Sequence, residues 1–350
     1  MRATYLHGEG DIRLADTPEP EIEHPTDALV RVTAACVCGS DLWGYRGARG
    51  GGGGPRRIGH EFVGVVEEVG DEVRTVRAGD FVIAPFVVSD GTCAPCRDGV
   101  QTSCVNGGPW GSTSRAGEPL DGAQAQWVRA PFADGTLVAT PVTPDESLVP
   151  ALLSLSDVMG TGHHAAVSAG VSPGDTVVVV GDGAVGLCAV LAASRLGAER
   201  VIAMSRHADR QRLATRFGAT DLVATRGDEG VAEVKELLGG RGADAVLECV
   251  GTKESMRQAL DSVRPGGRVG YVGVPAGGPE LPIGQMFSNN IAVAGGVAPV
   301  RHYLDALLAD VLDGKLDPGP VFDAEYPLER VADAYRDMSD RKVIKPLLRP

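Results

Sequence analysis

The feature that most constrains the fold of this 350-residue chain is an apolar run that leads directly into a glycine-rich turn. Thr176–Val180 is continuously apolar after its first residue, which is typical of a parallel strand buried on both faces of a sheet. The next six residues follow the pattern G-x-G-x-x-G, and a helical pattern continues to Leu196, with Gly197 as its C-cap. A strand, this turn and a helix in that order predict part of a doubly wound α/β domain.

The glycine turn predicts a dinucleotide site. The first glycine of such a turn allows a tight bend, the second lets the backbone approach a pyrophosphate, and the third lets strand and helix pack closely. The N-terminus of the helix attracts the phosphates. An ordinary glycine turn is the alternative, but the strand before it and the helix after it argue against that interpretation. The residues predicted to contact the cofactor here are Gly181, Gly183, Ala184, Val185 and Gly186.

The end of the next predicted strand, Arg200–Met204, bears on the choice between NAD(H) and NADP(H). An acidic side chain there would accept a hydrogen bond from the adenosine ribose and repel a 2′-phosphate. Ser205 stands at that position, and Arg206 and Arg210 follow it. A hydroxyl and two guanidinium groups suit a 2′-phosphate, so the sequence predicts NADP(H), with a solvated basic turn as the alternative.

The sequence before this motif has a different character from the sequence around it. Short alternating stretches separated by turn residues, such as Ala28–Ala35 and Phe81–Ala84, predict a β-rich barrel-like or sandwich-like domain. After about Val171, apolar strands alternate with helical patterns, with further strands expected at Ala245–Cys249 and Arg268–Val272. The chain is therefore predicted to combine a β-rich domain with a doubly wound parallel-sheet domain, and mixed structure returns from about residue 291.

Charge and hydropathy limit the partners. The chain has 33 Lys and Arg against 46 Asp and Glu, a formal net charge of −13. Such a chain repels nucleic-acid phosphates and acidic membrane surfaces, so we expect no nucleic acid and no membrane among its partners. No apolar run approaches the ~18 residues needed to span a bilayer, and Met1–Tyr5 lacks the apolar core of a signal peptide. We therefore expect a cytoplasmic protein that acts on a small molecule.

Gly50–Gly54 is a run of five glycines bracketed by arginines. We interpret it as a mobile loop. A loop whose arginines attract an anionic group is the alternative.

Three polar clusters lie far apart in the sequence. Cys38–Asp41, Gly59–Glu61 and Ser156–Asp157 carry thiol, imidazole and carboxyl groups. These are the three ligand types of a zinc ion that keeps one position open for catalysis. Taken singly, each has an ordinary explanation: a buried cysteine, a satisfied histidine and a helix N-cap aspartate. Spacing alone does not join them.

A resemblance to a known family does join them. The segments around these residues look like the zinc-containing alcohol dehydrogenases of the medium-chain dehydrogenase/reductase family, and the resemblance covers essentially the whole chain. It implies a GroES-like catalytic domain at 1–155 and 292–350, interrupted by a Rossmann domain at 156–291. Besides the glycine turn, the motifs in the family's order are Val37-Cys38-Gly39-Ser40-Asp41, Gly59-His60-Glu61-Phe62-Val63-Gly64-Val65-Val66, Val69-Gly70, Gly79-Asp80, Glu248-Cys249-Val250-Gly251, Pro265-Gly266-Gly267-Arg268 and Ile344-Lys345.

The resemblance also implies roles for single residues. Cys38, His60 and Asp157 would be zinc ligands, and Glu61 would sit beside the metal, able to ligate it when water or substrate leaves. Many relatives have cysteine at position 157, but bacterial NADP-dependent secondary alcohol dehydrogenases use an acid there, and a carboxylate is a sound zinc ligand. Ser40 matches the hydroxyl that relays the substrate proton.

Two tryptophans and the remaining cofactor contacts complete the implied site. Trp43 stands where many relatives continue the proton relay with a histidine, so the proton needs a route through water or ribose hydroxyls. Trp43 and Trp110 are expected to line a substrate pocket, with a place in the core as the alternative. The other implied cofactor contacts are Cys249, Val250, Val272 and, near the pyrophosphate, Lys345.

A second group of cysteines is harder to interpret. Seven cysteines are an odd number, which argues against a closed disulfide framework. Family members with a structural zinc use four cysteines in the pattern C-x2-C-x2-C-x7-C. Cys93 and Cys96 fit that pattern, but a glycine takes the third place and Cys104 follows early, so the sequence does not favour a second zinc. The open alternatives are free thiols, a disulfide within the trio, or a zinc that borrows Asp90 or Asp98.

The sequence thus leads to a zinc- and NADP(H)-dependent oxidoreductase acting on a small alcohol or carbonyl compound. A polyol or sugar dehydrogenase on the same scaffold is one alternative. A zinc-free quinone or enone reductase is another, although the joint presence of the ligand residues argues against it. A non-catalytic NADPH-binding protein with a vestigial metal site is the alternative outside the enzymes. Relatives are dimers or tetramers, so we expect a homodimer or homotetramer.

Overall fold

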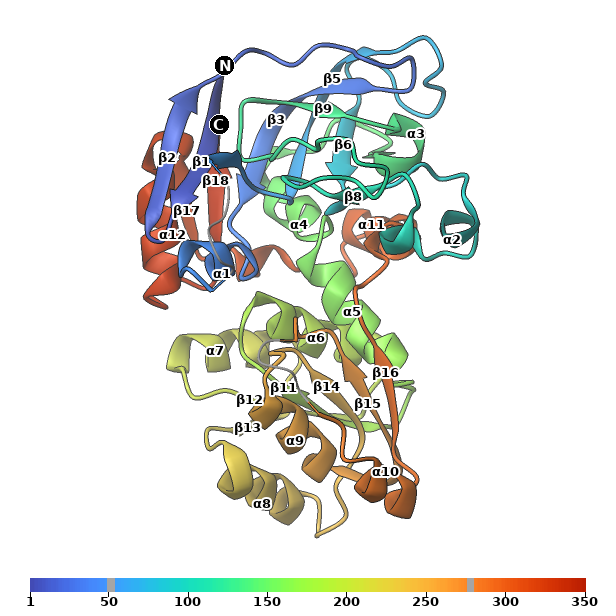
Figure 1. The fold of residues 1–350 in the computed structure, drawn as a ribbon. Helices are drawn as coiled ribbons and strands as arrows, with labels where there is room; N and C mark the ends of the chain where they lie inside the picture. Colours follow the sequence, from blue (N-terminus) through green and yellow to red (C-terminus); the bar gives the residue numbers. More distant parts are fainter. Residues whose placement is uncertain (49–53, 276–279) are drawn as a thin grey trace. The chain divides into compact units, whose positions relative to one another are not determined.

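Figure 1 shows the computed structural model, which describes residues 1–48, 54–275 and 280–350. These residues form two compact units, Met1–Asp157 with Pro299–Pro350, and Val158–Ala298. Most of the predicted Gly50–Gly54 loop lies outside the described residues. The observed limits differ from the predicted ones at 155/156 and 291/292. Residues 156–157 belong to the first unit, and strand β16 (Ala292–Gly295) pairs with the sheet of the second.

The first unit is β-rich, as predicted, and its largest sheet joins strands from both ends of the chain. The C-terminal strand pairs with an early strand through Leu347 opposite Cys36 and Leu348 opposite Ala35. This pairing brings the segment around residue 345 beside the end of that early strand. In sheet order the strands are β10 (Val138–Ala139), β6 (Phe81–Ala84), β5 (Phe62–Val69), β3 (Ala28–Cys36), β18 (Pro346–Arg349) and β17 (Ala324–Pro327), with β9 (Trp127–Ala130) also paired to β3.

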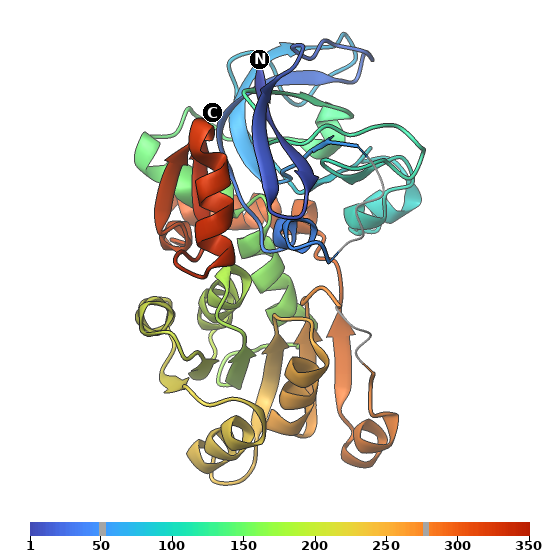
Figure 2. The same cartoon turned by 60° about the vertical axis from the view of Figure 1, so that its left-hand side comes forward.

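Smaller sheets and helices complete the first unit. One sheet has the order β2 (Asp11–Asp16), β1 (Arg2–Gly8), β4 (Arg56–Arg57), and another pairs β7 (Val87–Val88) with β8 (Gly108–Pro109). Figure 2 shows the C-terminal helix in red beside N-terminal strands in blue, and this helix does contact β2. The α-helices of this unit are α1 (Asp41–Tyr45), α2 (Ala94–Arg97), α3 (Ala133–Thr136), α4 (Val149–Ser154), α11 (Val300–Leu312) and α12 (Val331–Ser339).

The second unit is a doubly wound parallel sheet. Strands β11 (Thr176–Val180) and β12 (Arg200–Met204) have the predicted bounds, and helix α6 (Ala184–Arg195) begins where it was expected. All pairs in the sheet are parallel. The order is β13 (Asp221–Val223), β12, β11, β14 (Ala243–Glu248), β15 (Val263–Tyr271), β16, and the helices are α5 (Val158–Ser168), α6, α7 (Ala208–Arg216), α8 (Gly227–Leu237), α9 (Lys253–Ser262) and α10 (Ile283–Asn289).

The order of the strands locates the place where this sheet can bind a ligand. Counting outward from β11, the chain first builds β12 and β13 on one side and then β14, β15 and β16 on the other. Open parallel sheets bind ligands at the carboxyl ends of the strands where the order reverses, here between β11 and β14. The glycine turn lies at that point. No helix of the described residues is long and apolar enough to cross a membrane.

Candidate metal centre and glycine turn

The four predicted metal ligands converge in the first unit because two neighbouring strands carry them to one edge. Strands β3 and β5 are antiparallel, with Ala35 opposite Phe62. Cys38 follows the end of β3 and His60 and Glu61 precede the start of β5, so the pairing places them side by side. Asp157 arrives from the segment after α4, which is anchored where the Phe86 N–H donates to the carbonyl of Ser156 at 2.9 Å.

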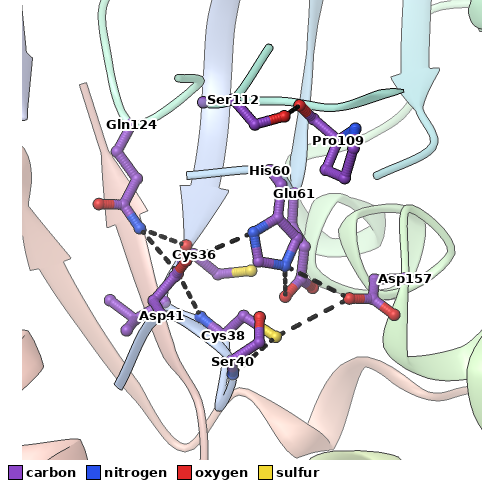
Figure 3. A network of polar contacts seen from close by, with 12 residues as sticks. Cys36, Cys38, Ser40, Asp41, His60, Glu61, Pro109, Ser112, Gln124 and Asp157 are labelled. Carbon is purple, nitrogen blue, oxygen red and sulfur yellow. Dashed lines mark hydrogen bonds and ion pairs between the residues drawn. The ribbon is translucent and has the colours of Figure 1, made fainter. Parts of the chain in front are cut away.

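The side chains of this cluster point toward one another (Figure 3). Asp157 Oδ2 lies 3.8 Å from Cys38 Sγ and 3.5 Å from His60 Nε2, and His60 Nε2 lies 3.9 Å from Glu61 Oε1. Ligand atoms of a tetrahedral zinc, 2.0–2.3 Å from the metal, are about 3.3–3.8 Å apart. The spacing and the mixture of sulfur, nitrogen and oxygen donors therefore fit a zinc ion.

The electrostatics of the cluster also fit a cation. Glu61 Oε2 is buried and has no hydrogen-bond partner among the described residues, so this oxygen has capacity for a metal ion or a further donor. Burial raises the pKa of Cys38, and Glu61 raises it further against the effect of His60. Burial alone would lower the pKa of His60, but Asp41 and Cys38 raise it well above its ordinary value. A bound metal would stabilise the thiolate and the carboxylates together.

Asp41 orients this cluster, a role that we did not predict from the sequence. Its Oδ1 lies 3.4 Å from His60 Nδ1, and its Oδ2 accepts the backbone N–H of Cys38 at 3.0 Å (Figure 3). Gln124 donates to the same carboxylate at 3.5 Å and to the Cys36 carbonyl at 2.9 Å. A carboxylate on one ring nitrogen leaves the other free for a metal. The signal was an acid three residues after the cysteine in the quoted motif.

Lys345 occupies a different place from the one predicted. Its side chain is 1% exposed, and Nζ lies 2.7 Å from Glu61 Oε1 and 3.3 Å from the Val37 carbonyl. Burial acts to lower the pKa of Lys345, but Cys36 and Glu61 raise it well above its ordinary value. An ammonium engaged in this way is not presented to a pyrophosphate. The pairing of β18 with β3 brings it to Glu61 instead.

Ser40 and the two tryptophans of the predicted site lie in different surroundings. Ser40 immediately precedes α1, is half-buried, and donates its backbone N–H to Cys38 Sγ at 3.5 Å. Trp43 lies on α1 and is half-buried. Trp110 is 3% exposed, donates to the Pro85 carbonyl at 2.9 Å and packs edge-on against Phe62. Trp110 therefore belongs to the core, which was the alternative to lining a pocket.

The second cysteine group also acquires a fourth ligand. The three cysteines form no disulfide, and the carboxylate that joins them belongs to Asp90, since Asp98 is exposed and outside the cluster. Asp90 Oδ1 accepts the Cys93 N–H at 2.9 Å, and the Asp90 N–H donates to Cys104 Sγ at 3.2 Å. The residues whose ligand atoms lie within 4.8 Å of one another are Asp90, Cys93, Cys96 and Cys104.

Packing explains why a glycine stands where the family pattern has its third cysteine. A Cβ at Gly99 would lie 2.9 Å from Nδ1 of His302 on α11, and the residue has φ +79°. A side chain at this position would be strained and would require His302 to move. Thiols and a carboxylate are groups that bind zinc, and four is the number of ligands that a structural zinc site uses.

The glycine turn of the second unit is sterically required. A Cβ on Gly186 would lie 2.1 Å from the Gly181 carbonyl oxygen, and Gly181 itself has φ +122°. Gly183 is the N-cap of α6 and provides no side-chain cap, and Ala184 and Val185 form the first turn of the helix. The turn thus presents open backbone N–H groups at a helix N-terminus, which suits phosphate groups.

The predicted contacts on neighbouring strands lie at the same edge. A Cβ on Gly181 would lie 2.9 Å from Val250 Cγ2 and 3.4 Å from Cys249 Cβ. Both residues follow β14, and Val272 directly follows β15. Cys249 and Val250 thus lie against the turn, and Val272 lies at the carboxyl end of the next parallel strand.

Two of the residues predicted to select between NAD(H) and NADP(H) form hydrogen bonds with Asp182 in the structure. Ser205 is 2% exposed, and its hydroxyl donates to Asp182 Oδ2 at 2.9 Å. Arg210 lies 3.3 Å from Asp182 Oδ1, and Arg226 lies 3.5 Å from the same oxygen. Arg206 is exposed. Asp182 and Arg226 were not predicted as site residues, although Asp182 stands inside the glycine motif.

Comparisons with known proteins identify the family of the chain. Residues 24–142 match the family of alcohol dehydrogenase GroES-like domains, and residues 184–312 match the zinc-binding dehydrogenases. The chain is 34% identical to zinc-type alcohol dehydrogenase B of Aspergillus flavus, over all of this chain and 81% of that protein. It is 30% identical to sorbitol dehydrogenase of Bacillus subtilis, over 95% of this chain and 92% of that one. The solved structure of alcohol dehydrogenase TADH from Thermus sp. ATN1 has a TM-score of 0.92 and 34% identity, and the match covers 100% of this chain and 99% of that one.

Proposed function

The chain belongs to the zinc-dependent alcohol dehydrogenases of the medium-chain dehydrogenase/reductase family, and we propose that it moves a hydride between NADP(H) and a small alcohol or carbonyl compound. The convergence of Cys38, His60 and Asp157 beside the unpartnered oxygen of Glu61 carries this proposal. When bound, zinc supplies Lewis-acid polarisation of a substrate oxygen, and the nicotinamide supplies or accepts the hydride.

The residues around the cluster have separate tasks. Cys38, His60 and Asp157 would hold the metal, and a thiolate and a carboxylate would balance its two positive charges. Asp41 fixes the imidazole so that Nε2 faces the metal. Ser40, next to this cluster, takes up or returns the substrate proton, which leaves by water or the ribose hydroxyls because no histidine follows it at position 43.

The first test of this proposal measures the metal and the reaction together. We expect protein purified without added metal or chelator to contain zinc and to oxidise small secondary alcohols with NADP⁺. A panel that also holds polyols and sugars tests the second candidate, a polyol dehydrogenase, which the similarity to a sorbitol dehydrogenase favours. Protein that lacks zinc but reduces quinones or enones with NADPH would overturn the proposal in favour of the zinc-free branch.

The preference for NADP(H) rests on guanidinium groups near the end of β12. Arg206 is exposed there, and Arg210 and Arg226 lie beside the glycine turn in contact with Asp182, so a 2′-phosphate would meet one exposed guanidinium and two that Asp182 also contacts. Arg206→Ala is expected to weaken NADPH binding about tenfold and to leave NADH binding nearly unchanged. Equal losses for the two cofactors would contradict this role.

We propose that the second cluster holds a structural zinc. Asp90, Cys93, Cys96 and Cys104 supply four ligands from one short segment, and none of the four positions remains open for a substrate. Two zinc ions per chain are therefore expected when both sites are filled. A value near one that does not change when Asp90 is replaced would exclude the second site.

An edge of the second unit supports the expected homo-oligomer. Strand β16 pairs on one side with β15 and ends the sheet order, and the nearby α10 exposes Ile283 at 65% and Phe287 at 86%. An exposed sheet edge beside large apolar side chains suits pairing with a second copy about a twofold axis. Phe287→Asp is expected to shift the mass in solution, measured by light scattering, toward the monomer.

A further inference from the structure

The carboxylate of Asp182 lies at the end of β12, although the chain has no acid there in sequence. Its Oδ2 accepts a hydrogen bond from the hydroxyl of Ser205, the residue that directly follows β12. Strands β11 and β12 are parallel neighbours with Val180 opposite Met204. The glycine turn that follows β11 therefore lies next to Ser205, which follows β12. An acid at the end of this strand is the group that accepts a hydrogen bond from the ribose in NAD-binding folds.

The Asp182 carboxylate is largely shielded from water, which strengthens its interactions with nearby charges. Its side chain is 9% exposed, and charges that are screened from water interact more strongly than they do at the surface. Arg210 donates to the Asp182 carbonyl at 3.2 Å and lies 3.3 Å from Oδ1, and Arg226 lies 3.5 Å from the same oxygen. The carboxylate is thus held by three neighbours, and one of its about four acceptor positions remains.

We propose that Asp182 is a specificity-determining residue for the cofactor. Its carboxylate accepts a hydrogen bond from the ribose 2′-hydroxyl of NAD(H) and repels the 2′-phosphate of NADP(H). Arg210 and Arg226 act in the opposite direction, and a 2′-phosphate must compete with Asp182 for both of them. The cofactor preference would then be set by the balance between one carboxylate and the arginines. This inference rests on the proposed dinucleotide site.

The test replaces the charge and keeps the shape. Asp182→Asn retains an oxygen that can accept from Ser205, so the turn keeps its hydrogen bond. Dissociation constants for NADPH and NADH are measured by equilibrium fluorescence titration, without substrate. We expect the ratio of affinities to move toward NADPH by about tenfold or more, because a like charge beside the phosphate is removed.

A matched variant controls for general electrostatics. Asp209→Asn removes the same charge from an exposed position on α7, where the aspartate pairs with Arg212. The ratio of NADPH to NADH affinities is expected to stay at the wild-type value in this variant. A shift as large as that of Asp182→Asn would overturn the inference, since net charge alone would then explain it.

A second variant keeps the inference falsifiable if the first folds poorly, as judged by thermal melting. Asp182→Ala removes both the charge and the acceptor, so NADH binding should weaken while NADPH binding improves. Equal changes for the two cofactors, or a ratio that moves toward NADH, would overturn the role of Asp182. A wild-type protein that prefers NADH contradicts the proposed NADP(H) preference but leaves the expected shift of the variants in place. A wild-type protein that binds neither cofactor contradicts the dinucleotide site and the inference with it.

Discussion

The two clusters of metal ligands in the first unit are assembled in opposite ways. Cys38 and Asp157 are 119 positions apart, and they meet only because β3, β5 and the segment after α4 come together. The second cluster takes all its ligands from residues 90–104, around the short helix α2. One site depends on the register of a sheet, and the other depends on a local loop.

The difference in assembly goes with a difference in chemistry. The dispersed cluster contains Glu61, whose Oε2 has no partner among the described residues and whose Oε1 is bound by Lys345. The local cluster has three thiols and a carboxylate that also accepts the N–H of Cys93. With Glu61 already bound by Lys345, we expect the first cluster to hold a metal through three ligands and to keep one position open, whereas the second has four ligands available. This difference is consistent with the proposed catalytic role of the dispersed cluster and the proposed structural role of the local one.

The largest effect is expected at the dispersed cluster. Cys38→Ser should remove the zinc of this site and reduce turnover more than about a thousandfold, because the polarisation of the substrate oxygen is lost. NADPH binding should persist, since the glycine turn belongs to the second unit. Zinc content by mass spectrometry and NADPH titration are the measurements. Cys188→Ala, which removes a thiol from α6, is the control, and a fully active Cys38→Ser variant would contradict the metal site.

The next largest effect concerns the buried ion pair beside that cluster. Lys345→Met leaves Glu61 buried without its cation, and we expect a loss of about 3–5 kcal/mol in the free energy of unfolding of the metal-free protein. The measurement is urea denaturation. Replacing both partners, with Lys345→Met and Glu61→Leu, should recover most of this loss.

Lys342→Met is a matched control for this change. Lys342 lies three residues earlier, is exposed, and pairs with Asp337 and Asp340 on the surface. The free energy of unfolding should change little in this variant, because exposed ion pairs contribute little. A similar loss of unfolding free energy in both lysine variants would show that the buried pair with Glu61 stabilises the protein no more than an exposed ion pair.

A smaller effect is expected from the residue that orients the imidazole. Asp41→Asn should weaken zinc binding at the dispersed cluster by about 10–100-fold, because His60 loses its carboxylate partner. Competition with a chelator gives the affinity. In Asp134→Asn, a carboxylate that holds the Arg74 and Thr75 N–H groups is lost instead, and zinc affinity should be unchanged. Identical affinities in wild type and Asp41→Asn would contradict the orienting role.

The smallest effect on turnover is expected at the local cluster. Asp90→Asn and Cys96→Ser should each lower the zinc content from two per chain to one and lower the melting temperature, while turnover changes little. Asp98→Asn is the control, since Asp98 is exposed and outside the cluster. If Asp98→Asn loses a zinc and Asp90→Asn does not, the assignment of the fourth ligand is wrong.

Local patterns were sufficient to predict the centre of the second unit. The apolar run, the glycine turn and the helix after it are consecutive in the chain, and each conformation depends on neighbours within a few residues. The predicted bounds of β11 and β12 are confirmed, and the glycine at position 186 proves to be sterically required by Gly181. The resemblance to a family, rather than spacing, joined Cys38, His60 and Asp157.

Two contacts that were not predicted join distant parts of the chain. Lys345 reaches Glu61 because β18 pairs with β3, and Asp182 reaches Ser205 because β11 lies beside β12. The choice of Asp90 over Asp98 depends on how one loop folds back onto Cys104.

The sequence by itself determined which elements form and which chemical groups are available, since periodicity, glycine turns and ligand types act over short distances. The tertiary structure decided which charges face each other. Burial and strand register set those distances, and neither can be read from local spacing when the partners lie 284 positions apart, as Glu61 and Lys345 do.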